Sequence, residues 1–172
     1  MTKTTVSVLK WVIYTALLLG FFVVQTTVGL IAVFDIRPVL IVAFAVAVSM
    51  QEREWYALSF GVIAGFMWDF SSGKASGFNA FVLAACCVVI ALAVMYLIGN
   101  NFLNSMIFCG ATMLLQGILD YLFSYQIWGY EGSWFILVRY ILPTALYTVL
   151  ITPLMYFLVR RLHRKLEGMI RA

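Results

Sequence analysis

The sequence predicts an all-α integral membrane protein, a bundle of six transmembrane helices that forms a single domain over residues 1–172. Of the 172 residues, 65% are hydrophobic and only 10% are charged, whereas soluble domains contain roughly 25% charged residues. The chain therefore has too few polar side chains to cover a water-facing surface, and most of it must face lipid. No linker rich in Gly, Ser or Pro divides it, so we expect one domain.

The spans are expected where apolar residues run without interruption. They cover about residues 11–34, 39–50, 55–68, 78–98, 102–123 and 135–159. Roughly 20 apolar residues cross a bilayer, so the second and third runs are short and either borrow flanking residues or lie where the bilayer thins. The first run lacks a cleavage site of small residues and is expected to be a retained helix. Pro38 suits the first turn of the second helix, and Gly99 suits the end of the fourth.

The basic residues predict the orientation of these spans. With six spans and a cytoplasmic N-terminus, eight of the 11 basic residues lie inside, in agreement with the positive-inside bias. The net charge of +4 therefore indicates orientation, and no nucleic-acid partner is expected. The basic tail is expected to anchor to anionic lipid headgroups, each charge contributing about 1 kcal/mol; a contact with a cytoplasmic filament protein is the alternative. This tail contains Arg160, Arg161, Arg164 and Lys165. His163, in the same tail, is expected to be solvated or lipid-facing.

The stretch from Trp68 to Asn79 is the strongest candidate for a functional site. Upstream of it, Gly61, Gly65 and Asp69 are spaced four apart and share one helical face. Small residues at this spacing let another helix backbone approach closely in lipid. The carboxylate at the end of the face is costly in a membrane unless it has a partner.

The turn within this stretch contains two glycines and several hydroxylated residues. Gly73 and Gly77 permit backbone angles that other residues resist, and Ser76 is placed to cap the next helix. Ser72 and Asn79 flank this turn. A plain helix break with polar turn residues explains much of the pattern, and a partner or ligand site is the alternative.

Further polar residues gather on the same predicted outer side. They are Asp35, Arg37, Asp69, Lys74, Gln116, Asp120, Glu131 and Arg139. Gln116 and Asp120 are four apart and share a face. Because an unpaired charge in a membrane is costly, we expect Arg139 to pair with Asp120 or with Asp69. The pair is either purely structural or part of a polar pocket or partner-docking surface.

Catalysis finds little support in the sequence. No Ser/His or Ser/Lys arrangement lies within a span, and no glycine loop that would cradle phosphate precedes a helix. Asp69 with Asp120 is a weak candidate for an acid pair. Cys86, Cys87 and Cys109 lie in apolar runs without metal-ligand spacing, which is typical of buried apolar residues. We expect no enzyme activity, no metal and no cofactor.

Several of these motifs, in this order, resemble the MreD family of the bacterial rod-shape, or elongation, machinery. Arg37-Pro38 is similar to the Arg-Pro pair that starts the second span in the family. The run from Gly61 to Ala80 resembles its glycine-rich, Asp-containing signature. Asp120 late in the fifth span, Pro153 late in the sixth and the basic tail also fit. The resemblance covers nearly the whole chain.

The resemblance implies a multi-pass protein of the bacterial cytoplasmic membrane with a non-enzymatic scaffold role. Its implied partners are membrane lipids, MreC, and through MreC the MreB filament, RodA and the transpeptidase partner of RodA, in side-wall peptidoglycan synthesis. The family fold is also similar to the S-components of vitamin transporters, which makes an S-component with an outward pocket the runner-up. S-components present an Ala-x-x-x-Ala pattern on the first helix, and here that run contains only Ala16 and Ala32, which argues against transport.

Overall fold

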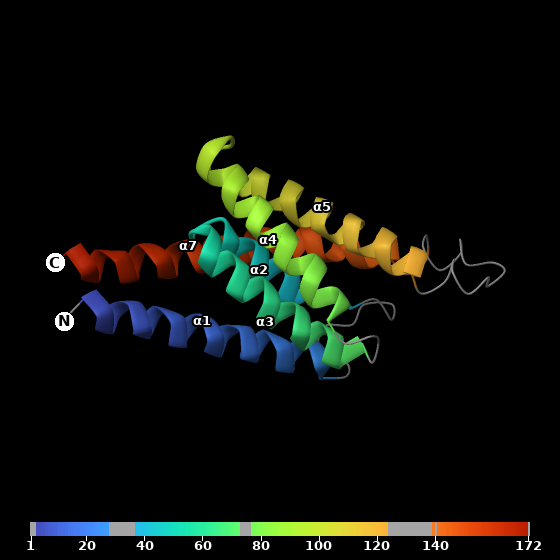
Figure 1. Cartoon of the computed structure of the whole chain (residues 1–172), viewed down its shortest axis with the longest axis horizontal. Coiled ribbons are helices and arrows are strands. Elements are labelled where there is room, and N and C mark those ends of the chain that lie inside the picture. Colours follow the sequence, from blue (N-terminus) through green and yellow to red (C-terminus); the bar gives the residue numbers. More distant parts are fainter. Residues whose placement is uncertain (1–2, 28–36, 73–76, 124–138, 140, 172) are drawn as a thin grey trace.

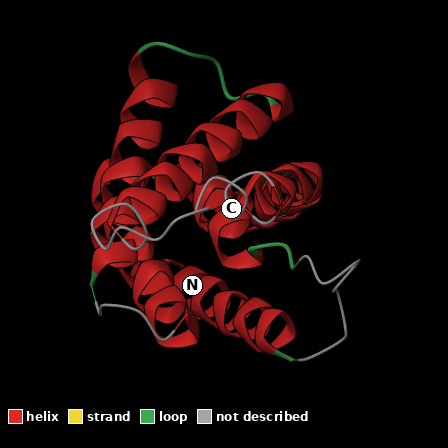
Figure 2. Cartoon of the chain, turned by 90° about the vertical axis from the view of Figure 1, so that its right-hand side faces the viewer, coloured by secondary structure: helices red, strands yellow, loops and turns green. Residues whose placement is uncertain are grey.

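The computed structural model describes residues 3–27, 37–72, 77–123, 139 and 141–171, and within them the main elements are helices without strands. Figure 2 shows this all-helical arrangement. The helices are α1 (Lys3–Thr26), α2 (Leu40–Ser49), α3 (Glu54–Ser72), α4 (Phe78–Tyr96), α5 (Phe102–Tyr121) and α7 (Leu142–Arg171). The predicted all-α fold is confirmed.

Four of these helices are long and apolar enough to cross a membrane, which confirms the predicted class of all-α membrane protein. They are Val8–Thr26, Phe78–Tyr96, Phe102–Tyr121 and Leu142–Gly168. Both chain ends lie at the same end of the bundle (Figure 1), as an even number of spans requires. We call this the terminal end and the opposite one the distal end. The count of six spans and the cytoplasmic position of the termini stay predictions.

Two helices continue past the C-terminal ends of the expected apolar runs. α3 has 19 residues and continues past Trp68 to Ser72, so the third run is not short: at 1.5 Å per residue it measures about 28 Å. The helix passes through Asp69 because that carboxylate has hydrogen-bond partners on α4. α7 continues as a helix to Arg171, and Figure 1 shows α1 and α7 reaching beyond the other helices at the terminal end.

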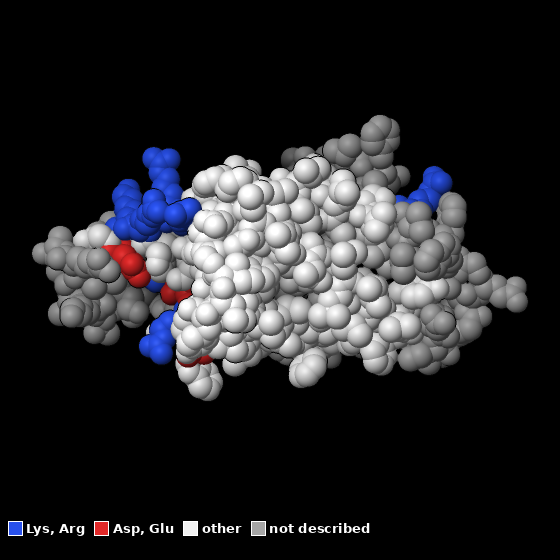
Figure 3. All heavy atoms as spheres, turned by 90° about the horizontal axis from the view of Figure 1, so that it is seen from above, with Lys and Arg blue, Asp and Glu red and all other residues white. Residues whose placement is uncertain are grey.

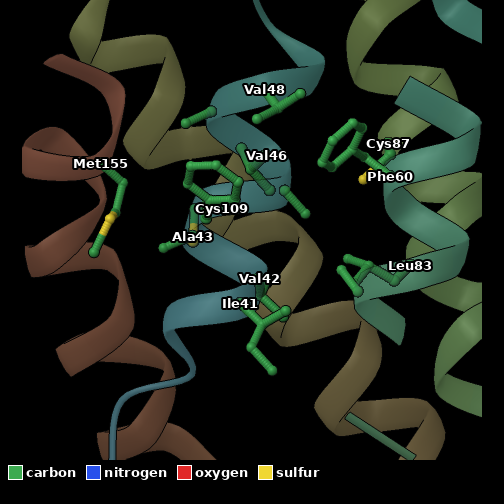
Figure 4. Close-up of a cluster of buried hydrophobic side chains, with 14 of the residues drawn as sticks. Ile41, Val42, Ala43, Val46, Val48, Phe60, Leu83, Cys87, Cys109 and Met155 are labelled. Carbon is green, nitrogen blue, oxygen red and sulfur yellow. The ribbon is translucent and has the colours of Figure 1, made fainter. Parts of the chain in front are cut away.

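The short helix α2 lies at the centre of the bundle. All ten of its residues are buried, and it contacts each of the other five described helices. Figure 4 shows its side chains Ile41, Val42 and Val46 among residues of the neighbouring helices. At about 15 Å it cannot cross a hydrocarbon core of about 30 Å, and enclosure by protein removes the need to do so.

Side chains from other helices satisfy the ends of α2. At its start, the Val39 N–H donates to Thr148 Oγ1 at 3.0 Å and the Ile41 N–H donates to Gln25 Oε1 at 3.2 Å. At its end, Asn100 Nδ2 donates to the Met50 carbonyl at 2.9 Å. Backbone groups at helix ends have no partner within the helix and are costly to leave unpaired in lipid. These contacts therefore allow α2 to begin and end inside the protein.

The surface of the bundle follows the division expected of a membrane protein. Large apolar side chains such as Phe70 (82% exposed) and Phe81 (77% exposed) lie on the outside. On the face seen in Figure 3, the charged side chains lie near the two ends and the central band has none. Cys87 and Cys109 are buried and Cys86 is half-buried, and all three are free, in agreement with their prediction as apolar packing residues.

Candidate functional site

The glycines of the predicted small-residue face lie directly against α4. A Cβ on Gly61 would sit 2.7 Å from the Cα of Ala84, and one on Gly65 would sit 2.7 Å from the backbone nitrogen of Ala80. Real Cβ atoms do not approach backbone atoms this closely. The close approach predicted for this face is therefore made within the bundle, by α3 and α4, the pair of helices with the most extensive contact.

The Asp69 carboxylate, at the end of the same face, caps the start of α4. Its Oδ2 accepts hydrogen bonds from the N–H groups of Gly77 (2.7 Å) and Ala80 (3.4 Å), and its Oδ1 accepts one from the N–H of Asn79 (3.2 Å). The residue is only 4% exposed. A negative charge is favourable at a helix N-terminus, where N–H groups lack partners within the helix. Asp69 thus has its partners in the backbone of the next helix.

Gly77 forms the boundary between the turn and α4. Its φ of +102° lies in the left-handed region, which glycine adopts without a steric penalty. It occupies the N-cap position, and no side chain at that position caps the helix. The predicted cap, Ser76, and Gly73 lie outside the described residues. Asp69, eight residues before Gly77, provides the capping group.

Asn79 and Gln116 form a buried amide pair between α4 and α5. They are 4% and 2% exposed, and Gln116 Nε2 donates to Asn79 Oδ1. Gln116 Oε1 is buried without a hydrogen-bond partner. Such an acceptor costs about 1–3 kcal/mol relative to one that is bonded.

A cavity of about 180 Å³ lies beside this pair, at the distal end of α3, α4, α5 and α7. Its lining residues are Val39, Trp68, Ser72, Asn79, Met113, Gln116, Gly117, Asp120, Ile141 and Thr144. Four predicted site residues, Ser72, Asn79, Gln116 and Asp120, are thus brought together. The prediction of a polar pocket or partner-docking surface on this side stays a prediction.

The remaining predicted residues of this side lie apart from the cavity. Arg37 is exposed and lines a separate hollow of about 480 Å³ with Gln25 and Phe70. Arg139 is exposed just before α7, and both Arg139 and Asp120 have interaction partners. The pairing of Arg139 with Asp120 or Asp69 stays a prediction.

A second polar cluster, at the terminal end, was not predicted. The Glu52 carboxylate, in the turn between α2 and α3, lies 2.5 Å from Lys10 Nζ and 3.0 Å from His163 Nδ1. It also accepts a longer bond from the Tyr14 hydroxyl at 3.4 Å. Glu52 therefore links the α2–α3 turn to α1 and to α7 through an ion pair and hydrogen bonds.

The prediction that His163 is solvated or lipid-facing is wrong. Its side chain is 15% exposed, with Nδ1 facing Glu52 and Nε2 3.1 Å from Glu167 Oε1. The error came from treating the basic tail as one solvated run, whereas α7 continues as a helix and turns one face towards α1.

A sequence signal for this face was present. Tyr156, Arg160, His163 and Glu167 follow one another at spacings of four, three and four, which places them on one side of a helix. Arg160 donates to the Tyr156 hydroxyl at 3.1 Å and lies over its ring. In turn, the Tyr156 hydroxyl donates to Asn100 Oδ1 at 2.8 Å.

The basic tail thus has two kinds of residue. Arg160 is half-buried and is held by Tyr156. Arg161, Arg164 and Lys165 are exposed. Only the exposed three are placed as the lipid-anchoring prediction requires.

The described polar groups mainly hold helix ends and turns in place. Asp69 caps α4, Asn100 bonds the end of α2, and Glu52 joins three separate segments. Over the described part of the chain, no group of three or more His, Cys, Asp or Glu side chains is arranged to hold a metal ion. These groups therefore fix how the helices are arranged, and the cavity beside Asn79 and Gln116 lies between them.

Comparison with known protein families matches residues 5–166 to the family described as rod shape-determining protein MreD. No curated protein gives a significant match to the chain. No solved structure gives one either.

Proposed function

Because the chain belongs to the MreD family, whose role is rod-shape determination, we propose that it is a non-enzymatic scaffold of the cell-elongation complex. In this proposal it spans the bacterial cytoplasmic membrane several times, binds MreC, and supports side-wall peptidoglycan synthesis. The observation that carries the proposal is the family match over residues 5–166 of the 172-residue chain. The use of Asp69 and Glu52 to fix helix ends supports a structural role.

The structure changes where the contact with MreC is best sought. Gly61 and Gly65 are covered by α4, so a partner helix cannot also use them. The lipid-facing side of the same two helices has a shallow apolar groove of about 390 Å³, lined in part by Val62, Phe66 and Phe81. A groove between two helices accepts the ridge of side chains of a third. We place the single transmembrane helix of MreC in this groove.

Photocrosslinking tests this contact. A photoreactive phenylalanine analogue at Phe81, which is 77% exposed on α4, is expected to crosslink to MreC in cells. The same analogue at Ile107, which is 67% exposed on α5, serves as the control and is expected to give no such product. Equal crosslinking at both positions, or at Ile107 alone, would move the contact away from the groove.

Depletion of the protein from its own cells tests the function as a whole. The cells are expected to lose their rod shape and become wider, and a plasmid copy is expected to restore their width. An unchanged shape combined with lost uptake of a vitamin would contradict the scaffold and favour the S-component. Because the first apolar run lacks the Ala-x-x-x-Ala pattern that S-components present, no second function is put forward.

A further inference from the structure

The ring of His163 has a carboxylate against each of its two nitrogens. Nδ1 lies 3.0 Å from Glu52 Oε1, in the turn between α2 and α3, and Nε2 lies 3.1 Å from Glu167 Oε1, one helical turn further along α7. The Glu52 side chain is 7% exposed, whereas that of Glu167 is 47% exposed. One carboxylate therefore lies inside the protein and the other at its surface, with the ring between them.

The hydrogen bonds that this arrangement can form depend on the protonation state of the ring. A neutral imidazole has one N–H and one acceptor nitrogen, whereas a protonated imidazole has two N–H groups. While both carboxylates are ionised, a neutral ring can donate to only one of them, and its other nitrogen faces an oxygen with no hydrogen between the two atoms. Protonation supplies the missing donor, so that both contacts become charge-assisted hydrogen bonds.

The other charged and titratable groups at this end come from three elements. They are Lys10 and Tyr14 of α1, Arg53 and Glu54 of the turn and the start of α3, and Arg160 and Arg164 of α7. The Lys10 ammonium and the Tyr14 hydroxyl both bond to Glu52. The helices α2 and α5 also pack against α7, and neither has a charged residue at this end.

Of these groups, Lys10 most directly opposes a positive charge on the ring. Its ammonium lies 2.5 Å from the Glu52 oxygen that His163 also contacts. Arg160 instead bonds to the hydroxyl of Tyr156. Because Glu167 contacts the other nitrogen of the ring, a charged ring is still attracted from that side.

The position of the ring allows its charge to change with the pH of the surrounding water. Histidine is the side chain that ordinarily changes charge between about pH 5 and pH 8, and His163 is the only histidine of the chain. Its Nε2 faces the exposed Glu167 carboxylate, so protons can reach it from solvent. Figure 1 shows α1 and α7 reaching beyond the other helices at this end, where fewer contacts hold α7 in place.

We propose that His163 is a pH-dependent link, which in its protonated form bridges Glu52 and Glu167 and so holds the last turns of α7 against the α2–α3 turn. The bridge is complete at acidic pH and loses one of its two bonds as the pH rises and the ring gives up its proton. Leu162 packs against the core and Leu166 is buried, so the end of α7 loosens without unfolding. This inference is independent of the scaffold function, because it rests on the terminal cluster alone.

Hydrogen exchange of the detergent-purified full chain at about pH 5.5 and about pH 8 tests the proposal. The rates are divided by those of an unstructured chain at the same pH, which gives a protection factor for each amide. The amides of residues 160–168 are expected to be at least about fivefold better protected at the lower pH, because hydrogen bonds to charged groups are the stronger ones. Equal protection at the two pH values would overturn the proposal, as would better protection at the higher pH.

Two neighbouring substitutions on α7 form a matched pair for this measurement. His163→Gln keeps a side chain that forms hydrogen bonds but does not titrate, and its two protection factors are expected to be equal. Arg164→Gln changes an exposed neighbour and is expected to retain the full difference. The α-amino group at the N-terminus, which also titrates in this pH range, is present in both variants. A difference that persists in His163→Gln would assign the effect to another group and contradict the proposal.

Glu167→Gln tests whether the ring acts as a bridge. An amide can accept from a ring N–H and can also donate to a ring nitrogen, so both protonation states of His163 then have two partners. The difference between the two pH values is expected to fall to less than half of the original ratio. An undiminished ratio would mean that the second carboxylate plays no part.

Nitrogen NMR of the unsubstituted protein provides a test that needs no variant. With labelled histidine, and after removal of any histidine tag, the ring signals belong to His163, because the chain has one histidine. The chemical shifts of the two ring nitrogens distinguish the protonated ring from the neutral one. We expect the protonated ring at about pH 5.5 and the neutral ring at about pH 8. A ring that stays in one state at both pH values would rule out the link.

Discussion

At the distal end, the Asp69 carboxylate bonds backbone N–H groups and an amide pair joins two helices, whereas at the terminal end the Glu52 carboxylate bonds side chains of separate segments. Asp69 bonds the backbone of the helix that directly follows its own in the chain. Glu52 instead bonds both Lys10 and His163, and His163 is 111 positions from Glu52 in the sequence. Two helices that are linked by a short turn are already held close together by the chain. Helices that are distant in sequence are held together only by contacts between their own side chains and backbones. The two ends therefore respond differently to substitution.

The largest effect is expected from filling the contact between α3 and α4. Gly65→Leu places a side chain where backbone atoms of Ala80 already lie, so the helices must separate, at a cost of about 3 kcal/mol or more. We expect loss of folded protein, measured as the amount in membranes and as the monodisperse fraction after extraction. Gly20→Leu is the control, because a Cβ at Gly20 meets nothing within 4 Å. Normal accumulation of the Gly65 variant would show that the two helices are not in close contact.

The next largest effect is expected at the terminal end. Glu52→Gln keeps the size of the side chain and removes the negative charge that faces Lys10 and His163, so the Lys10 ammonium loses its buried partner. Removing one partner of a buried ion pair costs about 3 kcal/mol, which we expect as a loss in the free energy of unfolding in detergent.

Glu54→Gln provides the matched control for this experiment. Glu54 lies two residues away and pairs with Arg53 at 3.8 Å, where the Arg53 side chain is 74% exposed. Because the Arg53 side of this long pair lies in solvent, while Glu54 is 27% exposed, we expect the pair to contribute about 0.5 kcal/mol or less. If the two variants unfold alike, the terminal end is not held together by Glu52.

A smaller and more local effect is expected at the distal end. Asp69→Asn removes the negative charge that caps α4, which we expect to cost about 2 kcal/mol. The amide groups of Gly77, Asn79 and Ala80, which bond to this carboxylate, are expected to exchange with deuterium faster, while amides of α5 remain protected. Uniform acceleration throughout the protein would instead mean that the carboxylate stabilises the whole bundle, as charges do at the other end.

The same comparison explains what the sequence revealed and what it did not. Gly61, Gly65 and Asp69 repeat every four residues shortly before α4, the helix that they contact, so their role is visible in a local pattern. Even there, the sequence could not tell whether the facing helix belongs to this protein or to a partner. The structure answers this through the contact of Gly61 with Ala84.

The terminal cluster left a weaker trace in the sequence. Lys10, Glu52 and His163 belong to three separate segments, and no spacing between them indicates that they meet. The regular spacing from Tyr156 to Glu167 was a usable signal, but it was hidden within a run of basic residues. The small size of α2 was likewise visible as a short apolar run, whereas its enclosure by five helices depends on packing that a single sequence does not show.

The smallest effects are expected from two neighbouring arginines, which separate the charges that hold the terminal end from those that face outwards. Arg160→Gln removes the bond to the Tyr156 hydroxyl and the contact with its ring, and we expect it to lower the free energy of unfolding by about 1 kcal/mol. Arg161→Gln changes an exposed side chain and is expected to alter that free energy by less than about 0.5 kcal/mol.

In vesicles that contain anionic lipids, the order of the two effects is expected to reverse. There Arg161→Gln is expected to remove about 1 kcal/mol of headgroup attraction, because the Arg161 charge can reach the headgroups whereas the Arg160 charge is held by Tyr156. The measurement is the gain in unfolding free energy in anionic over neutral vesicles, which is expected to be smaller for this variant. Equal dependence of both variants on anionic lipid would mean that Arg160 also faces the headgroups and that the tail acts as one surface.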